Sequence, residues 1–218
     1  MARIFDLTHR IHPGIAAYPG DPPYSATVSL VATGKSVPDP VPNLSRIHLG
    51  LHVGTHGDAP FHFVPAGPTI EQVELQRGLG PACLVPLEFL KPRQEILAEH
   101  LAPFRENIQR TRRVLLRTGW DKRFREADYF THHPVISTQA AEAMIDWGIL
   151  TVAMDFPSVD YTPYATHFLL LEKRIFIVEN LTGLERLPLD HFSISMLPLP
   201  LEGRDGSPIR AVAWTDDD

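Results

Sequence analysis

Residues 52 to 62, with the sequence His52-Val-Gly-Thr-His-Gly-Asp-Ala-Pro-Phe-His62, contain four side chains that can bind a metal ion or transfer a proton. They are His52, His56, Asp58 and His62. A lone histidine is usually an ordinary half-buried residue, but four chelating groups packed among glycines indicate a metal site. Structural zinc sites are usually rich in cysteine, whereas this chain has only Cys83. The ligand types therefore favour a catalytic metal site over a structural one.

The backbone through this cluster has to bend before its side chains can meet. Residues 46 to 51 alternate in the manner of a strand that enters the cluster. If that strand continued, His52 and His56 would lie roughly 13 Å apart, at about 3.3 Å per residue, too far to share one metal ion. We expect the bend at Gly54, because glycine adopts backbone angles that are closed to other residues. Asp58 follows His56 by two positions, so in an extended segment their side chains share a side.

This mixture of side chains defines the chemistry that the site could perform. Imidazole and carboxylate groups together suit zinc or manganese, and the absence of thiolate ligands leaves such a metal a strong Lewis acid. In known zinc enzymes the pKa of metal-bound water falls to about 7, which supplies hydroxide near neutral pH. Hydroxide can attack a carbonyl carbon, and a histidine can protonate a poor leaving group such as an amide nitrogen.

Composition restricts the setting of this chemistry. With 218 residues, of which 44% are hydrophobic, the chain can bury a full core, most simply as one domain over residues 1–218. A net charge of −6 argues against nucleic acid or an anionic membrane as a partner. We expect neither a membrane span nor a signal peptide, because no apolar run approaches the roughly 20 residues of a span and the N-terminus lacks the apolar stretch of a signal peptide. A single cysteine fits a reducing environment, so we expect a cytoplasmic protein.

The remaining sequence predicts alternating strands and helices. Ser137 to Gly148 is the clearest helix, because Ser137 can cap its start and Gly148 can end it. A second helical stretch should be split by Pro103. We expect strands near residues 2–8, 24–31, 82–89, 113–118, 149–154, 174–178, 192–199 and 209–214, and helices near 94–108, 137–148 and 164–171. No glycine-rich phosphate loop accompanies them, and the predicted class is α/β with a mixed sheet.

Three loops could influence the site. Tyr18 stands just before Pro19-Gly20, a combination that fixes a tight turn and could hold its ring over a pocket. Residues 32–44 form a proline-rich loop that could cover the site. The polar segment 121–134 carries His132 and His133, which we expect to be exposed.

The residues of the central cluster fit the H-x-G-T-H-x-D-x-P-x-H signature of the cyclase family, which includes bacterial kynurenine formamidases and manganese-dependent isatin hydrolases. Further matches keep their order over residues 5 to 182. Tyr18-Pro-Gly-Asp21 resembles an aromatic-Pro-Gly-Asp turn of the family, and Asp155-Phe-Pro-Ser-Val-Asp160 resembles its D-x-x-S-V-D segment. His167, followed twelve residues later by Glu179-Asn180-Leu181, resembles its H…ENL pair.

This resemblance implies a role for each matched residue. His52, His56 and Asp58 would hold a first metal ion, and Asp58 and Glu179 would bridge to a second that His167 completes. His62 would be the general acid or base, and Pro60 could aim it at the substrate. Tyr18 would contact the substrate where the formamidases carry a tryptophan, a departure that changes the aromatic wall. From position alone, His167 among apolar neighbours would be a core residue and Glu179 would face solvent.

The resemblance also implies a swivelling β/β/α fold and a homodimer or higher oligomer. We therefore expect a metal-dependent amidohydrolase that cleaves a C–N bond in a small amide such as an aryl formamide. Its cofactor should be two zinc ions, with manganese as the alternative metal. One alternative is a mononuclear manganese-dependent isatin or lactam hydrolase. The other is a metal-binding member of the fold without turnover, against which the proton-transfer group His62 argues. Asp155 and Asp160 could orient the ligands, although turn chemistry alone would explain them.

Overall fold

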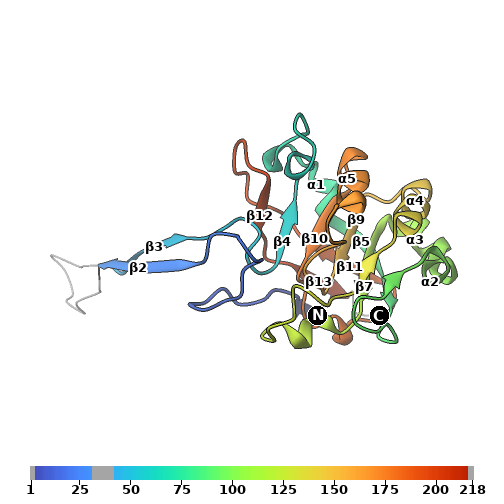
Figure 1. The fold of residues 1–218 in the computed structure, drawn as a ribbon, viewed down its shortest axis with the longest axis horizontal. Helices are drawn as coiled ribbons and strands as arrows, with labels where there is room; N and C mark the ends of the chain where they lie inside the picture. The colour runs from blue at the N-terminus through green and yellow to red at the C-terminus, as the bar shows by residue number, and fades with distance from the viewer. Residues whose placement is uncertain (1–2, 31–41, 216–218) are drawn as a thin grey trace.

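The computed structural model describes residues 3–30 and 42–215, and a nine-stranded mixed sheet forms its centre (Figure 1). The strand order is β1-β13-β11-β5-β7-β9-β10-β4-β12. Strands β5, β7, β9 and β10 run parallel, and the pairs on either side of them are antiparallel. The strands are β1 (Arg3–Asp6), β4 (His56–Asp58), β5 (Leu79–Pro86), β7 (Arg113–Arg117), β9 (Thr151–Met154), β10 (Phe176–Glu179), β11 (Phe192–Ser195), β12 (Gly206–Pro208) and β13 (Val212–Thr215). The predicted α/β class with a mixed sheet is confirmed.

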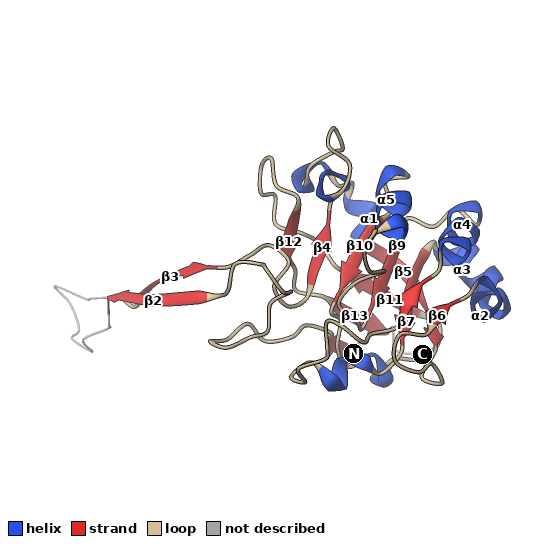
Figure 2. Cartoon of the chain, viewed as in Figure 1, coloured by secondary structure: helices blue, strands red, loops and turns tan. Residues whose placement is uncertain are grey.

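Apolar side chains on both faces of the central strands explain why these strands lie inside the molecule. Along β5, Cys83 and Val85 belong to one buried cluster, whereas Ala82 and Leu84 belong to a second on the opposite face. Strands covered on both faces read as continuous apolar runs, as in β7 and β9. The first cluster also contains buried residues of α2, α3, α4 and α5, so these helices cover one face of the sheet (Figure 2).

The helices begin and end where the local chemistry requires it. They are α1 (Leu75–Gly78), α2 (Ala98–Leu101), α3 (Arg105–Thr111), α4 (Thr138–Asp146) and α5 (Ala165–Glu172). The hydroxyl of Ser137 accepts a hydrogen bond from Ala140 N at 3.1 Å, which confirms the predicted cap of α4. The predicted break at Pro103 is also present, because a 3₁₀ turn at Ala102–Phe104 separates α2 from α3. None of the helices in the described ranges has the length and apolar character of a membrane span.

Two small sheets are not hydrogen-bonded to the central one. Strands β6 (Glu95–Ile96) and β8 (Val135–Ile136) form a short parallel pair. Strands β2 (Ser25–Leu30) and β3 (Leu44–His48) form an antiparallel hairpin that projects away from the rest of the molecule (Figure 1). The predicted strand over residues 46–51 is therefore displaced, since β3 ends at His48 and pairs with β2 before the chain turns into the cluster. Of the proposed cover, residues 32–44, the part from 32 to 41 lies outside the described residues.

Candidate metal centre

Strands β4 and β10 place three of the predicted metal ligands on one face of the sheet. The two strands are antiparallel, and their register pairs His56 with Glu179. Asp58 lies two residues beyond His56 and shares its side, as predicted. The distances are 3.4 Å from His56 Nε2 to Asp58 Oδ1 and 3.4 Å from His56 Nε2 to Glu179 Oε2. Glu179 is buried, so the solvent-facing position that a strand end alone suggests is wrong.

Gly54 supplies the bend that brings His52 to this group. Its φ of +69° lies in the left-handed region that glycine adopts without strain, which confirms the predicted bend. The carbonyl oxygen of Gly54 accepts a hydrogen bond from Asn180 Nδ2 at 3.1 Å and lies 2.8 Å from His56 Nδ1. After the bend, His52 Nδ1 lies 2.8 Å from Asp58 Oδ1. The same bend therefore orients His52 and His56 toward one carboxylate.

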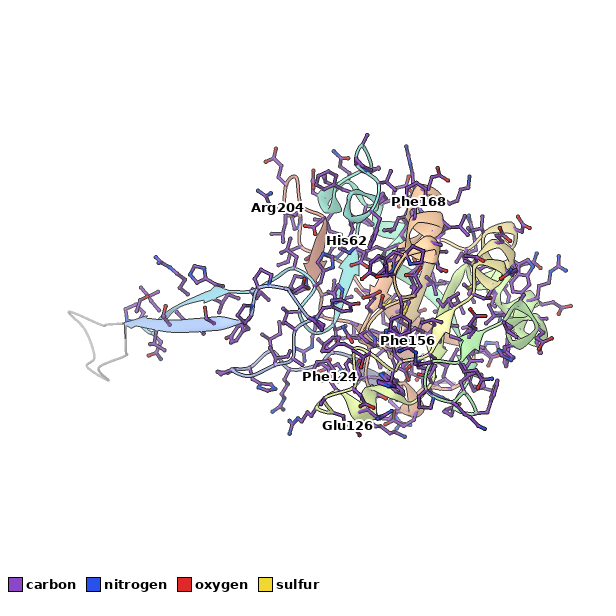
Figure 3. All side chains as sticks on the ribbon, viewed as in Figure 1. His62, Phe124, Glu126, Phe156, Phe168 and Arg204 are labelled. Atoms are coloured by element: carbon purple, nitrogen blue, oxygen red, sulfur yellow. The ribbon has the colours of Figure 1, made fainter. Side chains whose placement is uncertain are left out.

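Helix α5 contributes His167 from the other side of the cluster. Asp160 Oδ2 accepts a hydrogen bond from Thr166 N at 2.6 Å in the first turn of the helix, where a carboxylate is favourable. The other oxygen of Asp160 lies 2.6 Å from His167 Nδ1. His167 Nε2 then faces Glu179 Oε1 at 3.3 Å, while its neighbour Phe168 lies on the outer side of α5 (Figure 3). The histidine in this apolar sequence is thus part of the cluster.

His62 lies at the rim of the same group. It ends the 3₁₀ turn Pro60–His62, which begins with the proline that we expected to direct it. Its ring stacks on that of His52 with centroids 4.1 Å apart. Asp205, from the loop before β12, lies 2.8 Å from His52 Nε2 and 3.5 Å from His62 Nδ1. All six predicted ligand and proton-transfer residues therefore come together, and Asp205 joins them.

The donor atoms fit a divalent cation. His52, His56 and Asp58 each offer one ligand atom within 4.8 Å of the others, and so do Asp58, His167 and Glu179. Asp58 Oδ2 and Glu179 Oε1 are buried and accept no hydrogen bond from any described residue, although His167 Nε2 lies 4.0 Å from the first and 3.3 Å from the second. Such oxygens are costly unless something compensates them, and a cation bound by both groups would do so. The mixed nitrogen and oxygen donors suit zinc or manganese.

The charges of the cluster favour a cation as well. Burial disfavours a proton on His52, but the carboxylates of Asp58 and Asp205 outweigh burial and raise the pKa of His52 to about 10. Burial also opposes protonation of His167, whose pKa Asp160 and Glu179 raise to about 10. Burial would raise the pKa of Asp58, but His52 and His56 hold it well below its usual range. Positive charge is therefore stabilised here, whether protons or a metal ion carry it.

A pocket of about 390 Å³ opens above the cluster. Its inner end is lined by His52, His56, His62, His167 and Glu179, and its walls include Tyr18, Phe63, Phe130 and Tyr164. The predicted turn holds Tyr18 in place, since Asp21 N donates to Tyr18 O at 3.0 Å. The hydroxyl groups of Tyr18 and Tyr164 lie 3.5 Å apart. The pocket can therefore receive a small molecule with an aromatic or apolar part and a polar group that reaches the metal ligands.

Tyr164 has an unusual backbone conformation for an aromatic residue. Its φ of +62° lies in the left-handed region, where a bulky residue is strained. This conformation precedes α5 and leaves the Tyr164 ring 5.2 Å from that of Phe63 and 5.9 Å from that of His167, measured between centroids. Strain of this kind is often kept at binding sites. Nothing in the local sequence of Tyr164 indicates that it lines the pocket.

Other expectations need correction. His133, which we expected to be exposed, is fully buried, and its ring lies 4.4 Å from that of Tyr161 between centroids. Of the two interpretations left open for Asp155, the structure favours turn chemistry, because Asp155 accepts hydrogen bonds from the backbone of Thr118 and Gly119. Asp205 was missed altogether, since it lies far along the chain in a glycine-flanked turn without a recognisable motif.

Comparison with known proteins agrees with these observations. A family model described as "Putative cyclase" matches residues 5–161. The chain is 32% identical over 212 residues to the kynurenine formamidase of Bacillus cereus, and the match covers 95% of each chain.

Two solved structures share the fold. A protein from Bacillus stearothermophilus, described as a predicted metal-dependent hydrolase, is 26% identical, with a TM-score of 0.77 over 99% of this chain and 100% of that one. Isatin hydrolase A from Labrenzia aggregata, bound to benzyl benzoate, is 24% identical, with a TM-score of 0.82 over 99% of this chain and 94% of that one. At this identity the second likeness concerns the fold alone. The architecture expected from the motifs is thus found over nearly the whole chain.

Proposed function

The chain belongs to the cyclase family, and on this premise we propose that it is a metal-dependent hydrolase that cleaves the C–N bond of a small amide. One observation carries the proposal: two buried carboxylates, Asp58 and Glu179, each with an oxygen that accepts no hydrogen bond from a described residue, adjoin the inner end of an aromatic pocket with His62 at its rim. A purely structural metal site would need neither a pocket nor a histidine beside the ligands.

We propose two ions, with zinc preferred and manganese as the alternative. His52, His56 and Asp58 would hold one ion, and Asp58, His167 and Glu179 the other, so that Asp58 is shared. When bound, such ions polarise a carbonyl group and activate water near neutral pH. The protein fixes the ligands in advance, because His56 and His167 each have an outer partner on the ring nitrogen that faces away from the cluster.

His62 is proposed as the proton-transfer group. Its ring lies next to that of His52 but is more exposed than those of His56 and His167, and it lines the pocket. An amine leaves readily only after its nitrogen is protonated, and a histidine titrates in the range required to deliver that proton. A substrate carbonyl directed at the metal ligands would bring its amide nitrogen within reach of His62.

The walls of the pocket favour a substrate with an aromatic ring. Phe63, Phe130 and Tyr164 supply flat apolar surfaces, and Tyr18 adds a hydroxyl group. We propose an aryl formamide of the N-formylkynurenine type as the first candidate, which the relationship to kynurenine formamidases supports. Tyr18 is proposed to contact it. Isatin-type lactams are the second candidate, because their ring would occupy the same aromatic space.

A substrate screen tests this proposal. Purified protein, loaded with zinc or with manganese, is assayed against aryl formamides, isatins and cyclic imides, with Glu179→Ala protein as the control. Hydrolysis of a formamide that the control lacks would support the first candidate, and turnover of isatin alone would favour the second. Metal-loaded protein that hydrolyses none of them would contradict the proposal and favour the metal-binding alternative without turnover.

We further propose that residues 1–218 form one domain that assembles as a homodimer or larger homo-oligomer in the cytoplasm. The hairpin of β2 and β3 supports assembly, since Val28, Leu44 and Ile47 are exposed on it. An isolated two-stranded hairpin is at best marginally stable in water, and a second copy could cover it. Analytical ultracentrifugation would test this, and a monomer at micromolar concentration would contradict it.

A further inference from the structure

One carboxylate connects a metal ligand with the proton-transfer histidine. Asp205 Oδ2 lies 2.8 Å from His52 Nε2 and 3.5 Å from His62 Nδ1. The two rings stack with an interplanar angle of 28°, so they present these nitrogens to the same oxygen. From these contacts we infer that Asp205 is a positioning residue that fixes the orientation and tautomer of both histidines. This inference rests on the proposed function, because it assigns roles within the same site.

The backbone holds Asp205 firmly at this position. Its carbonyl oxygen accepts a hydrogen bond from Ala59 N at 2.9 Å, just after the end of β4. The next residue, Gly206, begins β12 and pairs with Asp58. A Cβ atom at Gly206 would lie 2.7 Å from His52 Cε1, so only glycine allows the chain to approach the ring so closely. The loop turns Arg204 outward, as Figure 3 shows, while Asp205 reaches inward.

The chemistry of the imidazole ring explains what the carboxylate does. A neutral ring carries its proton on one nitrogen only, and the partner of one nitrogen decides the state of the other. In a neutral, metal-binding His52 the proton would lie on Nε2, 2.8 Å from Asp205 Oδ2. Nδ1, which lies 2.8 Å from Asp58 Oδ1, would then be free to bind the metal. In the same way, a proton on His62 Nδ1 would face Asp205 Oδ2, 3.5 Å away. Nε2 would then be the nitrogen that exchanges a proton with substrate.

The other two histidine ligands are held in an equivalent way. His56 Nδ1 donates to the carbonyl oxygen of Gly54, and His167 Nδ1 donates to Asp160. Asp205 completes this arrangement for His52, and of these three outer partners it is the one that also lies within 3.5 Å of His62. Removing such an outer partner costs about 10- to 100-fold in metal affinity or activity in characterised sites. We expect effects of that size on both metal affinity and turnover.

The test compares Asp205→Asn and Asp205→Ala with Glu202→Gln, a carboxylate change on the same loop. We expect Asp205→Asn to lower metal affinity and kcat by about 10- to 100-fold each, with KM changed less than about twofold. Formate should restore turnover to Asp205→Ala, whose lost carboxylate is 39% exposed, but not to His62→Ala. Asp205→Asn protein with the metal affinity and kcat of the wild type would overturn the inference. The loss of one whole ion per chain would also overturn it, because Asp205 would then be a metal ligand.

A measurement without substrate separates this inference from the proposed function. Long-range ¹H–¹⁵N spectra of histidine-labelled, metal-loaded protein report which nitrogen of His62 carries the proton. We expect the proton on Nδ1 in the wild type and a mixture of tautomers in Asp205→Asn. An unchanged spectrum would overturn the role of Asp205 even if the enzyme is active. A changed spectrum in a protein that hydrolyses no amide would support Asp205 while the proposed function fails.

Discussion

Asn180 Nδ2 donates to the carbonyl oxygen of Gly54 at 3.1 Å, which ties the end of β10 to the bend between His52 and His56. The same Asn180 accepts a hydrogen bond from Tyr129 Oη at 2.7 Å, and its carbonyl oxygen accepts one from Thr55 Oγ1 at 2.5 Å. All of these groups are buried or nearly so. A fully satisfied buried network of this kind fixes one arrangement, so the two ligand-bearing segments keep a constant separation.

The first prediction concerns that bend. Gly54→Ala should destabilise the protein by about 1–2 kcal/mol, because alanine is strained at a φ of +69°. The added Cβ would also lie 3.2 Å from Ile15 Cδ1, which should shift His52 and weaken metal binding. Gly14→Ala is the matched control, since Gly14 has a φ of +83° but nothing within 4 Å of its Cβ. Chemical denaturation and metal titration measure both effects, and equal metal affinity in the two variants would contradict the prediction.

The second prediction concerns His62. His62→Ala should lose about 10²- to 10⁴-fold in kcat, the usual contribution of a positioned acid or base. Its metal content should stay that of the wild type, because neither of the two proposed ligand sets uses His62, which groups instead with His52 and Asp205. Steady-state kinetics with elemental analysis of the same sample decides the matter. A variant with full metal content and unchanged turnover would exclude His62 from proton transfer.

The third prediction concerns the pocket wall. Tyr18→Phe keeps the ring but removes the hydroxyl group that lies 3.5 Å from that of Tyr164. We expect KM to rise roughly 2- to 10-fold with little change in kcat, as for the loss of one hydrogen bond of about 0.5–1.5 kcal/mol. Tyr24→Phe serves as the control, since Tyr24 packs against the core. Equal KM values for wild type and Tyr18→Phe would mean that the substrate does not use this hydroxyl group.

The fourth prediction concerns acid stability. Burial lowers the pKa of His133 from 6.5 to about 4. Between these values the unfolded chain binds more protons than the folded one, so stability falls as the pH drops from about 6.5 to 4. The shift of the His133 pKa from 6.5 to about 4 corresponds to roughly 3 kcal/mol of unfolding free energy. His133→Phe should therefore show a shallower loss of unfolding free energy over this range, whereas His132→Phe, at an exposed position, should follow the wild type.

The sequence was sufficient to predict the cluster because most of its members are close together along the chain. His52, His56 and Asp58 lie within seven residues, so local geometry and one glycine determine how they meet. His167 and Glu179 needed the family resemblance, since each by itself resembles an ordinary core or surface residue. The parallel strands β5, β7, β9 and β10 were predictable from their apolar runs, which record burial on both faces, whereas β4 and β12 have no such run and were not predicted.

Long-range contacts explain what could not be predicted. Asp205 reaches His52 across 153 positions of sequence, and its turn carries no signal that distinguishes it from other polar turns. His133 lies in a polar segment, yet it is buried beside Tyr161, a residue 28 positions away. The strand predicted over residues 46–51 was misplaced for the same reason, since its position depends on the pairing of β3 with β2. The strand that a segment pairs with decides where that segment ends as a strand, and the local alternation of apolar and polar residues does not reveal this partner.

The most direct test of the account is the metal content per chain of protein purified without chelators and then supplied with zinc or manganese. Elemental analysis should give two ions per chain for the wild type and about one for Glu179→Ala, which removes a ligand of the second ion only. Glu172→Ala, at the exposed end of α5, should keep both ions. One ion that is insensitive to Glu179→Ala, or no ion at all, would contradict the shared two-ion centre on which the account depends.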